Sequence, residues 1–250
     1  ELIAQHPAAR REDARLLVIE RATGALHDAR IAALGAWLRP GDALALNETR
    51  VRPARLEVLR SATRGRVELL FVRPAPPAGE GAAWRVLARP AKRVREGDRL
   101  ETPDGSLEIE VVGFGADGER VVRVTRGDLE RTLGERGALA LPPYIHRAPG
   151  PADRDRYQTV FARVEGAIAA PTAGLHFTDE LLRALATQGV AIARTLLHVG
   201  PGTFRPITSC DPNAHPMDEE YYEVPQEAAA TLTRARTAGG RIVAVGTTVV

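Results

Sequence analysis

The stretch "GAIAAPTAGLHFTDELLRALATQGVAIARTLLHV" (166–199) decides the architecture, because its pattern changes twice. It opens on a short apolar run that predicts a buried strand. Residues 179–188 then predict a helix, with Thr178 as N-cap, two acidic residues in the first turn and Gly189 as the stop. Residues 190–199 return to an apolar strand. A strand, a helix and a strand in this order predict parallel pairing in a layered α/β sheet.

The same alternation extends on both sides of this stretch. Before it, "RLLVIE" (15–20) predicts a strand, residues 29–42 a short helix ended by a Pro-Gly pair, and residues 43–56 a second strand that runs into a polar loop. After it, residues 225–238 predict a helix and residues 241–250 a third buried strand.

Between these parts, residues 55–124 follow a different pattern of short alternating or apolar runs. Asp104-Gly105 and Asp117-Gly118 separate the later runs, and such pairs favour tight hairpin turns. The pattern predicts an all-β module, a small barrel or a sandwich. The fold class we expect is therefore α/β. It comprises a layered, largely parallel sheet domain (residues 1–54 and 146–250) and an inserted all-β, barrel-like domain (residues 55–145).

The charge composition leaves an anionic partner open. An apolar fraction of 44% over 250 residues is enough for a core and excludes wholesale disorder. Lys+Arg 34 against Asp+Glu 32 gives a formal net charge of +2, and Lys92 is the only lysine. Arginine has planar, forked donors that suit phosphate and carboxylate. A genome that prefers arginine codons is the plainer explanation of the composition.

Cys210 is the only cysteine, which excludes an internal disulfide and a cysteine-based metal or iron–sulfur cluster. No apolar stretch approaches the roughly 18 residues that span a bilayer, and no signal-peptide pattern opens the chain. We therefore expect a cytoplasmic protein with no membrane partner. The chain starts at Glu1 and stops at Val250 inside an expected strand, so we expect a fragment whose α/β domain continues further.

Ligands of open α/β sheets lie beyond the C-terminal ends of the strands. Three segments should meet there, namely Pro171–Thr178, His198–Phe204 and Gly246–Thr248. A fourth candidate is Asn47–Arg50, at the end of an earlier strand. These segments carry hydroxyl, amide and imidazole groups, and glycines that permit close backbone approach. The glycines of "HVGPGTF" (198–204) can equally serve only to turn the chain, and this stretch lacks the third glycine of a dinucleotide fingerprint.

Three histidines are candidate functional groups, each with a plainer alternative. His176 follows Thr172 near a helix N-terminus, where backbone donors can hold an anion, but a histidine there can also simply pack or bond a carbonyl. His198 has the same ambiguity among apolar neighbours. His215 precedes carboxylates that include Glu220, and suits a proton relay, a metal site or a solvated acidic turn. A single imidazole makes metal the weaker idea.

Two basic stretches are candidates for nucleic-acid contact. In "RDRYQTVFAR" (154–163), Arg154, Arg156 and Arg163 flank Tyr157 and Phe161. Phosphate contact combined with aromatic stacking is typical of nucleic-acid binding. "RPAKRVREGDRL" (89–100) is the densest basic run. A surface helix with a packed tyrosine and a solvated hairpin edge are the respective alternatives.

Taken together, these segments resemble the family of S-adenosylmethionine:tRNA ribosyltransferase-isomerases, which act in queuosine biosynthesis. The resemblance is long, ordered and spread over the whole chain. It covers "ELIAQHP" (1–7), residues 38–56, "RPAKR" (89–93), "LPPYIHR" (141–147), residues 155–178, residues 195–207 and residues 239–250.

The resemblance implies an α/β domain with an inserted β-barrel and a further C-terminal segment. It implies transfer and isomerisation of the ribosyl group of S-adenosylmethionine onto the aminomethyl-deazaguanine wobble base of tRNA. The products are epoxyqueuosine in tRNA, adenine and methionine. S-adenosylmethionine is then a consumed substrate, and neither a cofactor nor a metal is implied. One departure is Asp218, which stands where the family usually has a second histidine after His215.

The implied reaction needs a base, because a proton beside the sulfonium must be removed before the ribose ring opens. Histidine suits this role at cytoplasmic pH. We rank His176 first, His198 second, and His215 with Glu220 third. Substrate contacts are expected from Asn47, Thr49, Arg50, Tyr157, Gln158, Thr172, Gly174, Phe177, Thr178, Gly200, Gly202, Thr203, Phe204, Thr247 and Thr248. Contacts with tRNA are expected from Arg89, Lys92, Arg93, Arg154 and Arg156.

Two rival functions stay open, an S-adenosylmethionine-dependent RNA methyltransferase and a non-catalytic RNA-binding protein. The first usually needs a glycine-rich loop after its first strand, which "RATGALHD" (21–28) does not supply. The second suits the β module and the arginines but gives the histidine and threonine cluster no role. For the favoured enzyme, the expected partners are S-adenosylmethionine and the tRNA that carries the precursor base, and we expect a monomer.

Overall fold

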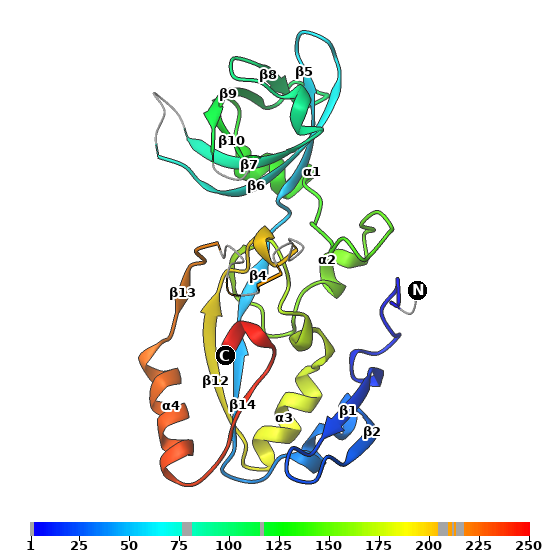
Figure 1. The fold of residues 1–250 in the computed structure, drawn as a ribbon, viewed down its shortest axis with the longest axis vertical. Helices are drawn as coiled ribbons and strands as arrows, with labels where there is room; N and C mark the ends of the chain where they lie inside the picture. The colour runs from blue at the N-terminus through cyan, green and yellow to red at the C-terminus, as the bar shows by residue number, and fades with distance from the viewer. Residues whose placement is uncertain (1–2, 77–81, 116–117, 205–209, 212, 214–217) are drawn as a thin grey trace. The chain divides into compact units, whose positions relative to one another are not determined.

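A computed structural model describes residues 3–76, 82–115, 118–204, 210–211, 213 and 218–250. The chain divides into two compact units (Figure 1). One comprises Glu1–Val51 and Pro142–Val250, and we call it the α/β unit. The other is Arg52–Leu141, the barrel unit. Each unit has a hydrophobic cluster of its own.

The barrel unit is a closed antiparallel barrel with the strand order β10-β7-β6-β5-β8-β9. Its strands are β5 (Arg55–Arg60), β6 (Arg66–Pro74), β7 (Ala83–Arg89), β8 (Arg99–Glu101), β9 (Glu108–Phe114) and β10 (Arg120–Arg126). Alternate side chains point into the barrel, as in β6, where Val67, Leu69 and Phe71 are buried and their neighbours are less so. The short helix η3 (Ala91–Arg93) connects β7 to β8.

Helix α1 (Leu129–Arg136) follows the last barrel strand and packs into the same core. Leu129 and Leu133, four residues apart on one helix face, belong to the barrel's hydrophobic cluster. The carboxylate of Asp128 caps the helix by accepting a hydrogen bond from the amide of Arg131 at 3.1 Å. The barrel unit therefore closes its core with its own residues.

The α/β unit is built on a four-stranded sheet of order β13-β12-β3-β14. Strands β12 (Ala191–Leu197) and β14 (Ile242–Ala244) run parallel to β3 (Ala43–Asn47), whereas β13 (Tyr222–Glu223) is antiparallel to β12. A second, two-stranded parallel sheet pairs β4 (Thr49–Val51) with β11 (Val164–Ala167). All five residues of β3 are buried, because α3 (Asp179–Thr187) and α4 (Gln226–Thr237) flank the central sheet on opposite sides (Figure 1).

The predicted fold class is confirmed, with a largely parallel sheet in one unit and an all-β barrel in the other. The N-cap predicted at Thr178 is also present, since its hydroxyl accepts a hydrogen bond from the amide of Leu181. Gly189 ends this helix with a φ of 90°, a backbone conformation that glycine adopts at little cost. Asp117, in the second predicted hairpin turn, lies outside the described residues.

The short helix predicted at residues 29–42 is confirmed in part, because a 3-10 helix occupies only the middle of this range. Residues Leu26–Arg30 form β2, which pairs with β1 (Arg15–Ile19) in a separate antiparallel hairpin. The 3-10 helix η2 (Ile31–Trp37) follows it. The apolar spacing of this segment fits a helix, but cross-strand pairing through the Thr23-Gly24 turn captures its first residues.

The buried strand predicted at residues 241–250 is wrong in length and burial. Strand β14 ends at Ala244 and is partly exposed, because it lies at the edge of the central sheet. Gly246, with a φ of 89°, then turns the chain into the short helix η8 (Thr247–Val249). The remaining short helices of the α/β unit are η1 (Arg11–Asp13), α2 (Asp153–Arg156), η5 (Thr172–His176) and η6 (Pro201–Phe204).

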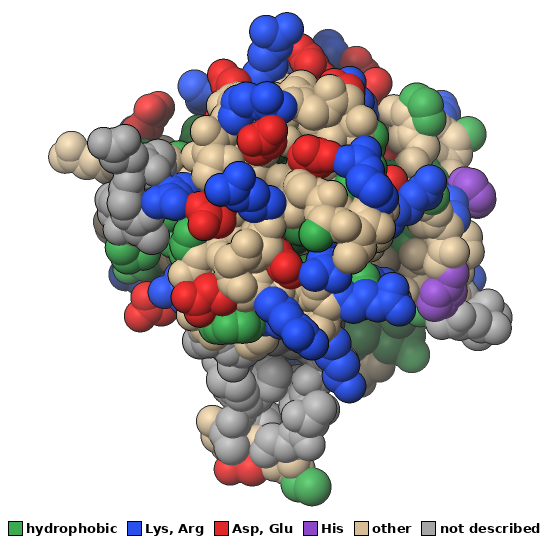
Figure 2. Space-filling model, turned by 90° about the horizontal axis from the view of Figure 1, so that it is seen from above, with side chains coloured by type: hydrophobic (Ala, Val, Ile, Leu, Met, Phe, Trp, Pro, Cys, Tyr) green, Lys and Arg blue, Asp and Glu red, His purple; other side chains and the backbone are tan. Residues whose placement is uncertain are grey.

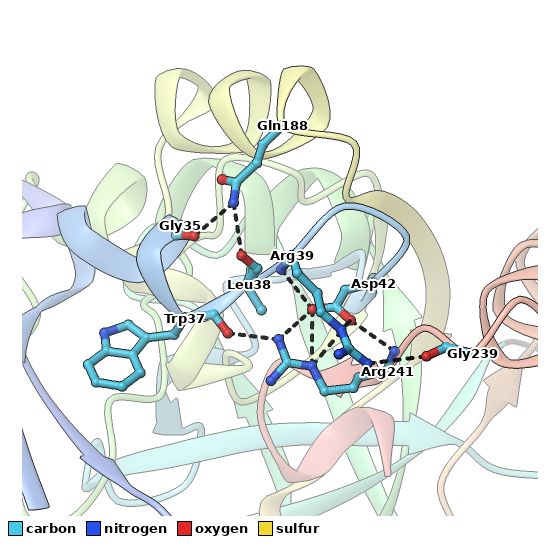
Figure 3. A network of polar contacts seen from close by, with 8 residues as sticks. All are labelled: Gly35, Trp37, Leu38, Arg39, Asp42, Gln188, Gly239 and Arg241. Carbon is cyan, nitrogen blue, oxygen red and sulfur yellow. Dashed lines mark hydrogen bonds and ion pairs between the residues drawn. The ribbon is translucent and has the colours of Figure 1, made fainter.

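A buried carboxylate fixes the start of two neighbouring strands (Figure 3). Asp42, which is fully buried, accepts hydrogen bonds from the amides of Arg39 at 3.0 Å and Arg241 at 2.9 Å. The guanidinium of Arg241 also reaches both carboxylate oxygens. Gln188, at the end of α3, donates to two carbonyls at the end of η2. These contacts hold the N-terminal ends of β3 and β14 in register, at the opposite end of the strands from the candidate site.

Candidate active site

A cavity of about 140 Å³ lies where the chain leaves β11, β12 and β14. Three of the four segments expected from the sequence line it: Pro171–Ala173 after β11, Thr203 after β12, and Gly246–Thr248 after β14. The C-terminal ends of these strands therefore bring together the segments, as open α/β folds do. The other lining residues are Tyr144, Tyr157, Ala169, Ala170 and Val199.

A second hollow of about 250 Å³ adjoins the first. The two share Val199, Thr203, Thr247 and Thr248 as lining residues. The second hollow adds an acidic wall, made of Asp218 and Glu220, together with Leu197 and Gly202. The pair of cavities thus combines apolar walls, hydroxyl groups and carboxylates.

Two buried hydroxyl groups of the first cavity have no hydrogen-bond partner of normal geometry. One belongs to Tyr157, a residue 7% exposed, whose phenol is influenced by the backbone of Ala170 but makes no hydrogen bond of normal geometry. Burial raises the pKa of Tyr157 to about 12, so the hydroxyl keeps its proton. The other belongs to Thr248. A buried polar group without a partner is costly, so this pair indicates a site that a polar ligand completes.

The glycines of the predicted "HVGPGTF" segment permit close approach to the acidic wall. The amide of Gly200 donates to Oε1 of Glu220 at 2.7 Å. A Cβ atom at Gly202 would lie 2.6 Å from a carboxylate oxygen of Asp218. These glycines therefore do more than turn the chain, since they hold two carboxylates against the backbone of η6.

His198 lies between two cavity-lining residues and is fixed from three sides. Its Nδ1 is 2.8 Å from the hydroxyl of Thr49, and its ring stacks on Tyr221 with centroids 5.6 Å apart. Gly166 lies beneath the ring, where a Cβ atom would come within 2.5 Å. Partial burial lowers the pKa of His198, so the ring is largely neutral at pH 7. Neither cavity includes His198 among its lining residues.

Asn47 holds the strands on which this arrangement depends. Its amide group donates to the carbonyl of Leu197 at 2.9 Å. Its side-chain oxygen accepts from the amides of Leu197 and Thr49, both at 3.1 Å. Gln158 acts similarly, because it makes two hydrogen bonds to the backbone of Val51. Both residues, expected as substrate contacts, use their amide groups inside the protein.

The segment that carries His176 divides into a cavity wall and a core. Beyond Ala173, Phe177 is buried against Phe161 in an edge-to-face contact with centroids 6.3 Å apart. Gly174 packs against the same Phe161 ring, which a Cβ atom would approach to 2.8 Å. Thr178 caps α3. Packing is thus the observed use of Phe177 and Gly174, and helix capping is that of Thr178.

His176 itself lies at the exposed end of η5, and neither cavity includes it. Desolvation lowers its pKa, and the positive charges of Arg11 and Arg156 act in the same direction. Arg11 in turn donates to the carbonyls of Leu175 and Asp155, each at 2.8 Å. Both histidines therefore lie outside the lining of the two cavities.

The expected basic residues fall into two groups. Arg154 and Arg156 belong to α2, and Arg156 donates to the carbonyls of Ala8 and Ala9. Arg89, Lys92 and Arg93 are exposed on the barrel unit, around η3. Arg50 is exposed on β4. His215 and the side chain of Phe204 lie outside the described residues.

Comparisons with known proteins identify the family. The profile of the queuosine biosynthesis protein family matches residues 1–250. This chain belongs to that family. It is 49% identical to the S-adenosylmethionine:tRNA ribosyltransferase-isomerase of Syntrophotalea carbinolica, over 99% of this chain and 71% of that protein. It is 48% identical to the enzyme of the same name from Syntrophomonas wolfei, over 100% of this chain and 70% of that protein.

A solved structure from Thermotoga maritima, titled as an S-adenosylmethionine tRNA ribosyltransferase, shares 30% identity with a TM-score of 0.41. The match covers 97% of this chain and 65% of the Thermotoga chain, so this chain spans slightly less than two thirds of that protein's length. No helix in the described ranges has the length and apolar character to cross a membrane. The same residues contain no group of three or more His, Cys, Asp or Glu side chains placed to hold a metal ion.

For this member of the queuosine biosynthesis family, sequence reasoning did not single out Tyr144, Ala169, Ala170 or Leu197, which also line the cavities. Tyr144 lies in "LPPYIHR" (141–147), a segment that carried the resemblance, so the motif was the signal that could have found it. The side chains of Ala169, Ala170 and Leu197 carry no polar group, so no chemical signal marks them. Asp218 drew notice only as a departure from the family pattern, and its position on the cavity wall gives that departure a place in the site.

Proposed function

We propose that this chain acts as an S-adenosylmethionine:tRNA ribosyltransferase-isomerase. It transfers and isomerises the ribosyl group of S-adenosylmethionine onto the aminomethyl-deazaguanine wobble base of tRNA. Epoxyqueuosine forms in the tRNA, and adenine and methionine leave. Family membership at 49% identity over 99% of the chain supports this function. The observation of the structure that carries it is the cavity in which three strand-end segments converge with two unpaired hydroxyl groups.

The two adjoining cavities fit the donor substrate in character. S-adenosylmethionine has a ribose with two hydroxyl groups, a flat base and a charged methionine. The hydroxyl groups of Tyr157 and Thr248 can exchange hydrogen bonds with the ribose, which removes the cost of leaving them unpaired. The carboxylates of Asp218 and Glu220 suit the sulfonium or the ammonium group electrostatically. We place the ribosyl group in the first cavity and the cationic part of the donor in the second.

For the base, we propose His198 in preference to His176. The base must accept a proton from the carbon beside the sulfonium, so it must be neutral, oriented and close to the donor. His198 has a lowered pKa, an oriented Nδ1 and neighbours on both sides that line the cavities. His176 shares the lowered pKa, but its neighbours Leu175 and Phe177 do not line either cavity. After proton loss, the ring opens, adenine departs and the amine of the tRNA base attacks the ribosyl carbon.

The partners follow from this reaction. The tRNA must carry the aminomethyl-deazaguanine base, and we propose the cytoplasm as the place of the reaction because tRNA is modified there. Arg89, Lys92 and Arg93 are the proposed phosphate contacts, since all three are exposed. The expectation of a monomer stays a prediction.

The deciding experiment incubates the chain with S-adenosylmethionine and tRNA that carries the precursor base. We expect free adenine and methionine in equal amounts, and a matching mass increase of the tRNA. Methylated RNA without adenine would identify a methyltransferase instead. Binding of the tRNA with neither product would leave an RNA-binding protein. A reaction mixture without tRNA is the control, and it should release no adenine.

A further inference from the structure

The loop around η3, residues 89–95, differs from the rest of the barrel surface in its charge. Most described arginines of the barrel unit pair with a carboxylate, as Arg60 does with Asp98 and Arg123 with Glu110. The loop carries four exposed cations, Arg89, Lys92, Arg93 and Arg95. Among the described residues no ion pair is found for the first three, whereas the charge of Arg95 helps to lower the pKa of Asp98. We call residues 89–95 the cation loop.

A buried arginine holds this loop from beneath. Arg120, at the start of β10, is 9% exposed. Its guanidinium donates to the carbonyls of Ala91 at 2.8 Å and Val94 at 3.0 Å, both in the cation loop. It also donates to the carbonyl of Gly118 at 2.7 Å, and its Cζ lies 4.7 Å from the centre of the Phe114 ring. One planar, forked donor group therefore joins the cation loop to the β9–β10 connection.

Arg120 adds charge as well as rigidity. Arginine stays protonated in proteins, and in the described part of the chain the partners of this guanidinium are carbonyl groups and one ring, with no carboxylate. Backbone carbonyls satisfy its hydrogen bonds without cancelling its charge. A positive charge in a weakly polarisable interior is poorly screened, so it raises the potential above the loop.

The chemistry of the surface selects its partner. Lys and Arg side chains that lack carboxylate partners bind phosphate groups and release counterions in doing so. The cation loop itself has no aromatic residue, and the exposed Phe114 nearby has the guanidinium of Arg120 over its ring. Phosphate contact is therefore favoured over base stacking at the loop. In the view of Figure 2, part of the face carries Lys and Arg side chains with few Asp or Glu side chains among them, whereas elsewhere the two signs alternate. Such a surface recognises a polyanion by its backbone rather than by its bases.

We propose that Arg120 is a positioning residue that presents the cation loop as a docking surface for the phosphate backbone of tRNA. This inference rests on the proposed function for its choice of tRNA as the polyanion. It assigns the barrel unit a task of its own, namely contact with tRNA that is independent of the base sequence. It also separates the cation loop from Arg156, whose guanidinium is already bonded to two carbonyls of residues 8 and 9.

The test measures binding of the full chain to a fluorescently labelled, unmodified tRNA transcript at several salt concentrations. In the double variant Lys92→Ala/Arg93→Ala we expect about a tenfold loss of affinity and a salt slope that is smaller by about two, one for each phosphate contact removed. The matched control is Arg131→Ala/Arg136→Ala, which removes two ion-paired cations from the same unit. The control should bind within about twofold of the parent chain, with the same salt slope.

The role of Arg120 is tested by coupling. Arg120→Met should weaken tRNA binding in the parent chain and add little in the Lys92→Ala/Arg93→Ala background, because it acts through the loop. A melting curve shows whether the barrel still folds. If Arg120→Met does not fold, the double variant and its control still decide the docking surface. Additive losses, or an unchanged salt slope in the double variant, would overturn the inference.

Failure of this inference is distinguishable from failure of the proposed function. If the double variant and its control bind tRNA equally well while adenine is still released, the docking surface is refuted and the proposed enzyme activity stands. If tRNA binding depends on the cation loop but no adenine is released, the docking surface stands and the proposed enzyme activity is refuted. The double substitution should weaken binding of a transcript with a changed anticodon by the same factor as it weakens binding of the original transcript. A loss confined to the original anticodon would contradict recognition of the backbone.

Discussion

Individual residues of the α/β unit carry roles that their neighbours in sequence do not reveal. Asp42 is fully buried and has two backbone amides and a guanidinium as partners, so its charge is compensated where water is excluded. Tyr157 is almost as buried, but its hydroxyl has no partner of normal geometry. The first arrangement holds the fold, and the second is suited to a ligand.

Asp42→Asn should lower the free energy of unfolding by about 2 kcal/mol at pH 7, because a charge-assisted network is broken inside the protein. The contacts from Arg241, first of all, hold the pKa of Asp42 far below its unfolded value of 3.8. The stability that Asp42 supplies is therefore present above pH 4 and is lost as the pH falls toward the folded pKa. Urea unfolding from pH 7 to pH 2 measures this, with the exposed Asp155→Asn as control. Equal pH profiles in the two variants would contradict it.

Tyr157→Phe should reduce the rate of adenine release at low S-adenosylmethionine concentration by about fivefold, the effect of one lost hydrogen bond to the ligand. Protein stability should hold or rise slightly, because an unpaired buried hydroxyl disappears. Thr159→Val is the matched control, since its hydroxyl is also buried and unpaired but does not line either cavity. Similar kinetic losses in both variants would argue against a ligand contact at Tyr157.

His198→Ala should abolish adenine release while melting remains near that of the parent chain, and His176→Ala should leave measurable turnover. In the parent chain, kcat should rise with pH and reach half its plateau below pH 6.5, since burial lowers the pKa of His198 and only the neutral ring accepts a proton. Rate measurements on both variants and a pH profile check this. Loss of turnover in His176→Ala alone would move the base to His176.

At the scale of elements, close backbone approach decides how the strand ends meet. Strand β11 can lie beneath the ring of His198 because Gly166 has no side chain. Helix η6 meets the acidic wall through Gly202 for the same reason. These contacts cross between elements that are distant in sequence, so the glycines are requirements of the site rather than of the local chain.

Gly166→Ala should displace the ring of His198, because the added Cβ would lie 2.5 Å from it. We expect a loss of kcat of at least about tenfold, since a catalytic group moved by about 1 Å is poorly oriented. Gly113→Ala is the matched control, because Gly113 also lies in a strand and has no neighbour within 4 Å of a Cβ atom. The Nδ1 resonance of His198 in NMR spectra should shift in the first variant only. An unchanged spectrum and rate would refute the contact.

At the scale of the whole molecule, the chain is divided between two cores. The barrel unit closes all six strands on themselves and fills the interior with its own side chains. The α/β unit draws its core from residues on both sides of the insertion, such as Leu44 and Leu185. Removal of the barrel would therefore leave the other core intact, and each unit has the composition of an independent domain.

The isolated segment 52–141 should fold by itself. Its hydrophobic cluster contains no residue from outside the segment, and a closed barrel has no open edge that needs a partner. Thermal and urea unfolding of this fragment should show one cooperative transition in circular dichroism. The fragment with Phe71→Ala, which loses a fully buried ring, should unfold at a lower urea concentration. Its free energy of unfolding should be smaller by about 3 kcal/mol. A gradual transition without a midpoint would refute this domain division.

The sequence by itself determined the fold class, the helix at residues 179–187 with its Thr178 cap, and the segments that meet at the cavity. Local periodicity, caps and turn residues encode these features, because each depends on neighbours only a few residues away. Long ordered motifs in the sequence also indicated the family. Only the tertiary structure decided that residues 26–30 pair as a strand, that residues 241–250 turn after Ala244, and that neither His176 nor His198 lines the two cavities. Unpaired hydroxyl groups, a guanidinium beneath a loop and a ring above a glycine depend on contacts between residues that are distant in the sequence, and no local pattern contains them.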